Sequence, residues 1–292
     1  LGAASVTSAA GRPIRLGGPI FLKSDDPDAL AREHRRLGYS AAYCPRVTLA
    51  DKDRIRAIEK AYAQHGVVIA EVGAWSNMLD PDPAKKAESL KLVTEKLALA
   101  DAVGARCCVN IAGSLNPKVW FGPHRDNFSK AFFDATVETA RRVIDAVKPT
   151  RTKFTLEMMG WALPTGPDEY LALIKAIGRK AFGVHLDVCN GINSPARFYA
   201  NAAFIEECFR KLGPHIVSSH AKDLEWVVEL NVHFKEVIPG RGEVDYRTWL
   251  RELSKLPHQP PLMLEHLKGA DEYEEGRNYI MKTGRELGCE FA

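Results

Sequence analysis

Four side chains able to bind a metal ion stand at the ends of four short apolar segments of the chain. They are Glu157, Asp187, His220 and Glu265, separated by 30, 33 and 45 residues. One strand, one helix and two loops occupy roughly 30 residues in a repeating strand–helix chain. The spacing therefore predicts that four consecutive strands each carry one ligand at the same height, so that all four converge on a single ion.

Three carboxylates and one imidazole form a mostly oxygen ligand set, which suits hard divalent cations. We expect one divalent ion, with Mn²⁺ favoured over Mg²⁺, Co²⁺ and Zn²⁺, and with positions left for substrate oxygens. Such an ion polarises a carbonyl and an adjacent hydroxyl and acidifies the C–H bond between them. Glu157 and Glu265 would lie on opposite sides of the ion and act as the acid/base pair on the two faces of the substrate carbon.

Each ligand candidate also has an ordinary structural interpretation. Glu157 could pair with a lysine on a neighbouring strand, and Asp187 could cap the loop that follows it. His220 could be a hydrogen-bonded core histidine, and Glu265 a paired core acid. Four such residues at four successive strand ends favour the metal site over four separate coincidences.

The elements that must position these residues follow from apolar periodicity and turn signals. Strands are predicted at 14–21, 40–44, 67–72, 107–111, 154–159, 181–188, 216–223 and 261–267, and helices at 28–37, 52–65, 84–103, 129–147, 167–178, 196–212, 246–256 and 271–287. Eight strand–helix units favour a parallel sheet closed into a single (β/α)8 TIM barrel, an α/β fold. The predicted first strand is not followed by a GxGxxG motif, so a dinucleotide site is not indicated. We predict a TIM-barrel catalytic domain at 14–292 after a disordered lead-in at 1–13.

Composition narrows the classes of partner. The 292 residues include 40 basic and 37 acidic ones, for a net charge of +3, which is too balanced for bulk attraction to nucleic acid or membranes. Six cysteines without a CxxC pair predict reduced, buried thiols and a cytoplasmic location. No apolar run approaches the roughly 20 residues of a membrane span. A small-molecule sugar or polyol is the expected partner, and a homo-oligomer or a small partner subunit is compatible with the sequence.

Two long predicted loops, 114–127 and 224–244, lie at the strand ends that carry the ligands. Loops of this length in compact domains are commonly functional. Trp75, Trp120, Trp161 and Trp226 fall in loops at that end and are expected to form aromatic walls for a sugar face or an aglycone ring, or to be ordinary loop packing. His124 could serve as an acid or base, or be a solvated loop histidine.

Three further side chains are candidates for substrate contact. Lys222 shares a strand face with His220 and is expected to bind a substrate oxygen as a catalytic residue, or to pair with Glu157 or Asp187. His185 would line the barrel beside Asp187 or fill its interior. Arg241, within Pro239-Gly240-Arg241-Gly242, could contact substrate or a neighbouring subunit.

The pattern resembles the xylose isomerase-like TIM-barrel superfamily of sugar phosphate isomerases and epimerases. The stretches that carry the resemblance are Thr155-Leu156-Glu157, His185-Leu186-Asp187, Ser219-His220-Ala221-Lys222-Asp223, the run from Ile238 to Tyr246, and Met263-Leu264-Glu265-His266, with a weaker match at Ile69-Ala70-Glu71-Val72-Gly73-Ala74-Trp75. The resemblance implies that Glu157, Asp187, His220 and Glu265 are the metal ligands and that the two glutamates are the acid/base pair.

The sequence departs from parts of this superfamily. Asn190 stands where ketose epimerases carry a histidine, three residues after the metal aspartate, and is expected to face substrate. Trp226 stands where they carry an arginine. The extra histidines of endonuclease IV-type members are absent from 43–45 and 73–75, so that activity is not expected.

Three hypotheses remain. The first is a divalent-metal-dependent isomerase or epimerase of a sugar or keto-polyol, which acts by proton abstraction next to a polarised carbonyl. The second is a lyase of the same superfamily, an inosose-type dehydratase or an enzyme that cleaves 3-keto-glycosides. The third is a non-catalytic barrel subunit.

Overall fold

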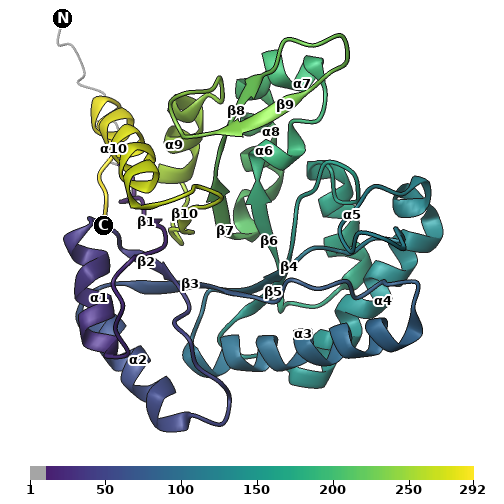
Figure 1. The fold of residues 1–292 in the computed structure, drawn as a ribbon, viewed down its shortest axis with the longest axis horizontal. Coiled ribbons are helices and arrows are strands. Elements are labelled where there is room, and N and C mark those ends of the chain that lie inside the picture. The colour runs from purple at the N-terminus through teal and green to yellow at the C-terminus, as the bar shows by residue number, and fades with distance from the viewer. Residues whose placement is uncertain (1–10) are drawn as a thin grey trace, which may run out of the picture.

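Eight parallel strands form a closed barrel surrounded by helices, which confirms the predicted (β/α)8 TIM barrel (Figure 1). The computed structural model describes residues 11–292. Around the barrel the strands follow the order β1-β10-β7-β6-β5-β4-β3-β2, and pairing of β1 with β10 closes the ring. The barrel strands are β1 (Leu16–Gly17), β2 (Ala41–Tyr43), β3 (Val68–Gly73), β4 (Cys107–Asn110), β5 (Lys153–Glu157), β6 (Phe182–Asp187), β7 (Ile216–Ala221) and β10 (Leu262–Leu264).

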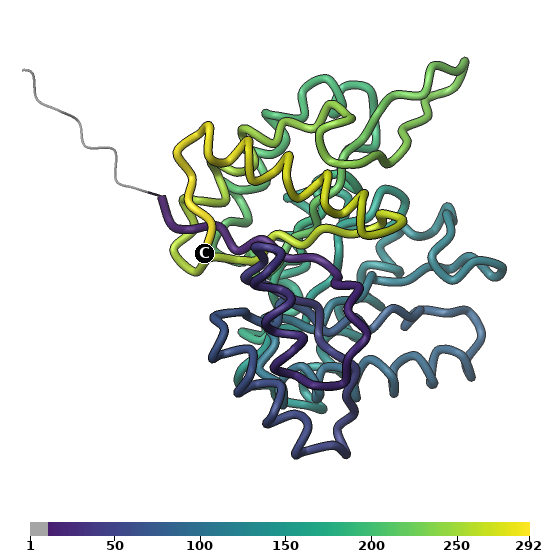
Figure 2. Tube along the Cα trace, turned by 60° about the vertical axis from the view of Figure 1, so that its left-hand side comes forward, coloured from purple at the N-terminus to yellow at the C-terminus, as the bar shows by residue number. Residues whose placement is uncertain are grey.

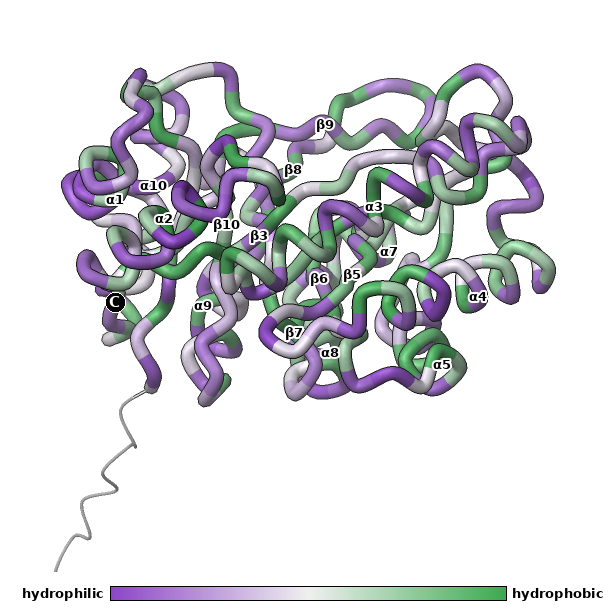
Figure 3. The backbone as a smooth tube through the Cα atoms, turned by 90° about the horizontal axis from the view of Figure 1, so that it is seen from below, coloured by the Kyte–Doolittle hydropathy of each residue, from purple (hydrophilic) through white to green (hydrophobic). Residues whose placement is uncertain are grey.

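Helices alternate with the strands and cover the outside of the barrel. The main ones are α1 (Pro27–Arg36), α2 (Lys52–Gln64), α3 (Pro83–Val103), α4 (Lys130–Val147), α5 (Pro167–Ile177), α8 (Asn201–Leu212), α9 (Tyr246–Ser254) and α10 (Ala270–Glu286). Shorter ones are α6 (Val188–Gly191), α7 (Pro195–Tyr199), and the 3-10 turns η1 (Arg125–Phe128) and η2 (Gly213–His215). Figure 3 shows hydrophilic and hydrophobic stretches alternating along helices such as α4 and α5, as expected for helices with one face on the barrel.

Local signals set the helix ends. Asp26 caps α1 by accepting hydrogen bonds from the backbone N–H groups of Asp28 and Ala29. Asp82 caps α3 in the same way ahead of Pro83, and Gly104 ends that helix with a φ of 68°. An aspartate cap, a proline in the first turn and a glycine after the last turn are residue types typical of helix ends.

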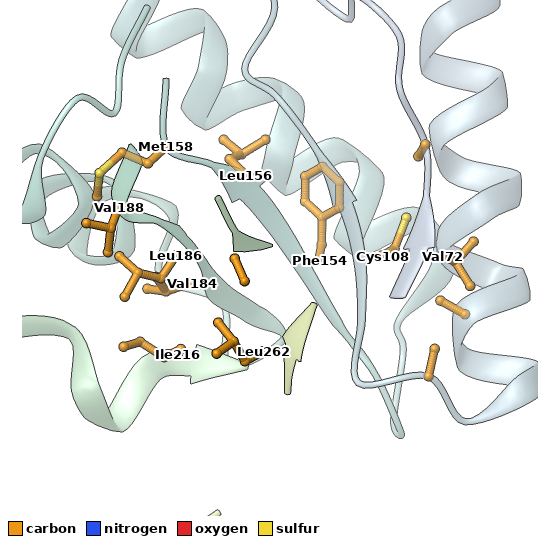
Figure 4. Packing of buried hydrophobic residues seen from close by; sticks show 14 of the residues in the cluster. Val72, Cys108, Phe154, Leu156, Met158, Val184, Leu186, Val188, Ile216 and Leu262 are labelled. Carbon is orange, nitrogen blue, oxygen red and sulfur yellow. The ribbon is translucent and has the colours of Figure 1, made fainter. Parts of the chain in front are cut away.

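Alternation along each strand separates a packing face from an interior face. Phe154 and Leu156 of β5 belong to the large buried cluster between strands and helices, as do Val184 and Leu186 of β6 (Figure 4). The intervening residues face the barrel interior, so Glu157 and Asp187 at the ends of β5 and β6 lie at its mouth.

Several predicted elements are wrong in detail. The first strand, expected at 14–21, is reduced to the two residues of β1. The single helix expected at 196–212 is divided at Ala200, because the Asn201 amide donates to the backbone oxygens of Phe198 and Glu243 at 2.8 and 3.0 Å. Residues 1–10 of the lead-in expected at 1–13 lie outside the described residues. Within the rest of it, the Arg12 N–H donates a hydrogen bond to the Ser254 carbonyl at 2.7 Å.

The segment 224–244, expected to be irregular, contains all of an antiparallel hairpin except its first residue, Asp223. Strands β8 (Asp223–Trp226) and β9 (Phe234–Val237) pair with each other, separate from the barrel sheet. Figure 2 shows this hairpin projecting from the body of the molecule at the upper right. Lys222 interrupts the strand predicted at 216–223, which therefore ends at Ala221.

Two sequence expectations concern the whole described chain. Within residues 11–292 none of the helices combines the length and apolarity required to cross a bilayer. All six cysteines are free thiols; Cys107, Cys108, Cys189 and Cys208 are buried and the other two are partly buried.

Candidate metal centre

The four predicted ligands come together at the mouth of the barrel. One ligand atom from each of Glu157, Asp187, His220 and Glu265 lies within 4.8 Å of the others. Nδ1 of His220 is the centre of this cluster, at 2.6 Å from Glu157 Oε1, 3.0 Å from Glu265 Oε1 and 3.8 Å from Asp187 Oδ2. The side chains come from β5, β6, β7 and the residue after β10, as the strand-end spacing predicts.

The two carboxylate oxygens of Asp187 have different environments. Oδ1 accepts a hydrogen bond from the Asn190 N–H at 2.9 Å and so caps the short helix α6. Oδ2 is buried and has no hydrogen-bond partner, and the same is true of Oε1 of Glu265. Buried oxygens without donors are costly, and a cation between them would remove that cost.

Glu71 of β3 holds the other side of the His220 ring and was not predicted as a site residue. Its Oε2 lies 3.1 Å from His220 Nε2, and its Oε1 lies 2.9 Å from His185 Nε2. Ser218 also donates to Oε1. Contact of Glu71 with Nε2 leaves Nδ1 directed at the carboxylate cluster, which is the carboxylate–histidine arrangement common behind metal ligands. Glu71, His185 and His220 form a second group of metal-type ligands, but both Glu71 oxygens already accept hydrogen bonds, whereas Asp187 Oδ2 and Glu265 Oε1 have no hydrogen-bond partner.

Burial and neighbouring charges shift the pKa values of the carboxylates in this interior network. Burial by itself would raise the pKa of Glu71, but the His185 and His220 imidazoles outweigh it and lower that pKa well below its usual range. Burial raises the pKa of Asp187 to about 7, although Lys222 opposes the increase. Of the three candidate carboxylate ligands, Asp187 is the one whose pKa is raised, whereas those of Glu157 and Glu265 are lowered. A cation beside Asp187 favours its ionised form.

Lys222 places an ammonium group against the same cluster, as the sequence predicted. Nζ lies 2.8 Å from Asp187 Oδ2 and 3.0 Å from Glu265 Oε1, and it donates to the Asn190 amide oxygen at 3.0 Å. The contacts to Asp187 and Glu265 are ion pairs that lack hydrogen-bond geometry, so both carboxylate oxygens remain without a hydrogen-bond partner. Burial would lower the pKa of Lys222, but Asp187 and Glu265 outweigh it and hold the pKa well above its ordinary value.

The charge balance fits a divalent cation even with this lysine present. The three ligand carboxylates outnumber the one ammonium group, so the cluster keeps a net negative charge that favours a cation. The donor set, mostly oxygen with one imidazole, suits Mn²⁺ or Mg²⁺. Glu157, Asp187, His220 and Glu265 are thus the residues that would hold the ion.

A cavity of about 950 Å³ opens from this cluster. Of the predicted substrate contacts, Trp75, Trp120 and Asn190 line it together with Lys222. Residues that sequence reasoning did not assign to the site also line it, among them Tyr43, Glu236 and His266. Glu236 belongs to β9 of the hairpin and reaches within 3.4 Å of the Lys222 Nζ, a contact between distant segments that strand spacing could not reveal.

Four other predicted site residues do not line the cavity. The ring of His124 accepts a hydrogen bond from the Asp126 N–H at 3.2 Å and caps η1. His185 is fully buried in the barrel interior against Glu71. Trp226 packs against Phe198, Tyr199 and Phe234, and the Arg241 guanidinium pairs with Glu275 of α10 at 2.6 Å.

The glycines around Arg241 serve a structural purpose. The buried carboxylate of Asp223 accepts hydrogen bonds from the backbone N–H groups of Gly240, Gly242, Leu224 and Val244, at 2.8 to 3.0 Å. Gly240 has a φ of 97°, and a Cβ at Gly242 would meet an Asp223 oxygen at 2.4 Å. Asp223 therefore fixes the loop that follows the hairpin, next to the site lysine.

The chain belongs to the xylose isomerase-like TIM-barrel family, whose sequence profile matches residues 31–283. Among curated proteins, none matches the sequence. The resemblance inferred from the strand-end motifs is therefore confirmed at the level of the family.

Solved structures share the fold at low sequence identity. A xylose isomerase-like TIM barrel protein from Mycobacterium smegmatis in complex with magnesium is 21% identical, with a TM-score of 0.65 over 95% of this chain and 98% of that one. The 3-keto-D-glucoside 4-epimerase of E. coli is 13% identical, with a TM-score of 0.68 over 93% and 99%. A probable 3-DHS dehydratase from Bacillus anthracis is 12% identical, with a TM-score of 0.66 over 92% and 97%. Known structures of this fold thus include an epimerase and a probable dehydratase.

Proposed function

We propose that this protein is a divalent-metal-dependent isomerase or epimerase of a sugar or keto-polyol. The observation that carries the proposal is the convergence of Glu157, Asp187, His220 and Glu265, with two buried carboxylate oxygens that lack donors, at the base of a large cavity. A divalent ion bound there supplies the Lewis acidity that polarises a substrate carbonyl and its neighbouring hydroxyl. Mn²⁺ is the favoured ion, and Mg²⁺, Co²⁺ or Zn²⁺ would suit the same donors.

The protein's own groups would move the proton. Glu157 and Glu265 end strands that flank β6 and β7, so their carboxylates approach the reacting carbon from different sides. One carboxylate would remove the proton next to the carbonyl and keep it, and the other, as a carboxylic acid, would deliver its own proton to the opposite face. Lys222, held by Asp187 and Asn190, would donate a hydrogen bond to a substrate oxygen and stabilise the negative charge that develops on it.

A lyase of the same family is the second candidate. Two observations favour it: Asn190 occupies the position at which ketose epimerases carry a histidine, and the cavity of about 950 Å³ leaves room for a leaving group beyond the sugar ring. The same first proton abstraction by a glutamate would then be followed by departure of water or an aglycone.

The test is turnover of ketohexoses, inososes and 3-keto-glucosides in D₂O by protein stripped with EDTA and then reloaded with Mn²⁺. With an isomerase or epimerase the product keeps all atoms of the substrate except for the exchange of hydrogen for deuterium, whereas with a lyase the substrate loses water or aglycone. Glu157→Gln should reduce turnover by a factor of at least ~100, the lower range for loss of a general base. Full turnover by Glu157→Gln would refute both enzyme hypotheses, and stability unaffected by chelation with no turnover would favour a non-catalytic subunit.

Other features of the function belong to the same proposal. The expected partner is a small sugar or polyol, with a cytoplasmic location and neither nucleic acid nor membrane as a ligand. Assembly as a homo-oligomer or with a small partner subunit is compatible with the chain.

A further inference from the structure

Four large aromatic side chains line one side of the cavity and are exposed there. Trp75 and Phe121 are each 43% exposed, Trp120 is 38% exposed and Trp161 is 37% exposed. Together they form what we call the aromatic wall. Aromatic side chains of this size are usually mostly buried, so four exposed ones around a single cavity indicate a ligand surface.

The wall has two parts, Trp75 beside the metal centre and a cluster of Trp120, Phe121 and Trp161. The ring of Trp75 lies 6.3 Å from that of His220, so the wall begins at a candidate metal ligand. The Trp120 and Phe121 rings are 5.3 Å apart, and those of Phe121 and Trp161 are 6.4 Å apart. The Trp161 indole N–H donates to the Phe121 backbone oxygen, which satisfies its polar atom and leaves the ring faces for apolar contact.

A buried hydrogen-bond network holds the wall in place. The Asn127 amide donates to the backbone oxygens of Gly122 and Trp161, both at 3.3 Å, and its oxygen accepts from the Leu115 N–H at 3.0 Å. The side-chain amide of Asn77 donates through its nitrogen to the Ser114 carbonyl and accepts through its oxygen from the Ser114 N–H. The loop therefore presents Trp120 and Phe121 from an ordered backbone, which reduces the entropy cost of ligand binding.

A free sugar would not use this surface. A sugar ring carries polar hydroxyls around its edge and needs one aromatic platform, whereas this wall continues with the aliphatic side chains of Val47, Leu99, Ile111 and Met159. Cavities of roughly 300–1,000 Å³ enclose drug-sized ligands. The cavity of about 950 Å³ is at the top of that range, and its polar lining comprises the groups of the metal end together with Arg46, Thr48 and Lys96.

We propose that the substrate is a glycoside-like molecule, in which a sugar or keto-polyol ring at the metal end is joined to a flat apolar aryl group that packs on Trp120, Phe121 and Trp161. The assignment of the sugar to the metal end rests on the proposed function. The assignment of the aryl group rests on the aromatic wall alone.

The experiment measures binding of matched glycoside pairs by calorimetry in the presence of Mn²⁺. The probes are the methyl and 4-nitrophenyl β-glycosides of glucose, galactose and xylose. We expect at least one 4-nitrophenyl glycoside to bind ~10-fold or more tightly than its methyl partner, as removal of an aromatic group from water implies. Trp120→Ala and Phe121→Ala should abolish the difference, Trp120→Phe should retain most of it, and Tyr199→Ala, an exposed aromatic outside the cavity, should not alter it.

Each outcome bears on the inference. Equal affinities within every pair, absence of binding by all six glycosides, or an aryl preference that survives Phe121→Ala in a variant with unchanged thermal unfolding would overturn it. An aryl preference that persists while Mn²⁺ has no effect on sugar binding would contradict the proposed function instead, and leave the aryl site standing.

Discussion

Replacement of Lys222 by methionine tests whether this lysine and a metal ion neutralise the same oxygens. Its Nζ contacts Asp187 Oδ2 at 2.8 Å and Glu265 Oε1 at 3.0 Å, and the side chain is only 2% exposed. Removal of one partner of a buried ion pair costs about 3–5 kcal/mol, because the other charge is left uncompensated. Met fills a similar volume without charge, so the metal-free variant should lose stability of that order.

A bound divalent ion would supply the missing positive charge. We therefore expect the loss from Lys222→Met to be smaller by about 2 kcal/mol or more in excess Mn²⁺ than in EDTA. The measurement is urea unfolding in both buffers at a pH of about 8.5. Lys222 opposes the increase in the Asp187 pKa, so its removal raises that pKa above about 7, and the high pH limits relief of the penalty by proton uptake. Lys235→Met, which removes an exposed lysine paired with Glu225, is the control and should change stability little in either buffer. Equal losses for Lys222→Met in the two buffers would refute the reasoning.

Three further predictions concern Glu71, Asp187 and Asp223. Glu71→Gln should weaken Mn²⁺ binding about 10–100-fold in calorimetry while the barrel stays folded, because an amide is a poorer partner for the His220 and His185 rings; unchanged affinity would rule out a positioning role. Mn²⁺ affinity should fall as the pH is lowered from about 8 to 6, because a proton competes with the ion for Asp187, and a flat affinity profile would contradict this. In metal-free protein the stabilising contribution of Asp187 should be present below its unfolded pKa of about 3.9 and be lost as the pH rises through its folded pKa of about 7. Asp223→Ala should lower the free energy of unfolding by about 3 kcal/mol or more, because four backbone N–H groups lose their acceptor, and a loss below about 1 kcal/mol would show that water replaces it.

The convergence of the four candidate ligands was predictable because strand periodicity and strand-end position are local properties of the sequence. Glu157, Asp187, His220 and Glu265 each follow a short apolar run, and a closed parallel barrel brings such ends together. The inward direction of Lys222 followed from its two-residue spacing from His220.

Residues whose partners lie far along the chain were not predictable in this way. Glu71 contacts His185 and His220, which are 114 and 149 residues away, and nothing in its own segment distinguishes it from a paired core acid. Its one signal was a carboxylate within an otherwise apolar strand. Trp226 shows the reverse case: its position near a strand end suggested substrate contact, but the β8–β9 hairpin brings Phe234 back against it and closes an aromatic cluster away from the cavity.

The central claim is that four side chains bind one divalent ion at the mouth of the barrel. A crystal of the protein grown with Mn²⁺, with diffraction recorded at the manganese absorption edge, tests it most directly. We expect one anomalous peak per chain, about 2.0–2.3 Å from oxygens of Glu157, Asp187 and Glu265 and from Nδ1 of His220. Absence of a peak there, with the Lys222 ammonium alone bridging Asp187 and Glu265, would contradict a metal site at these residues.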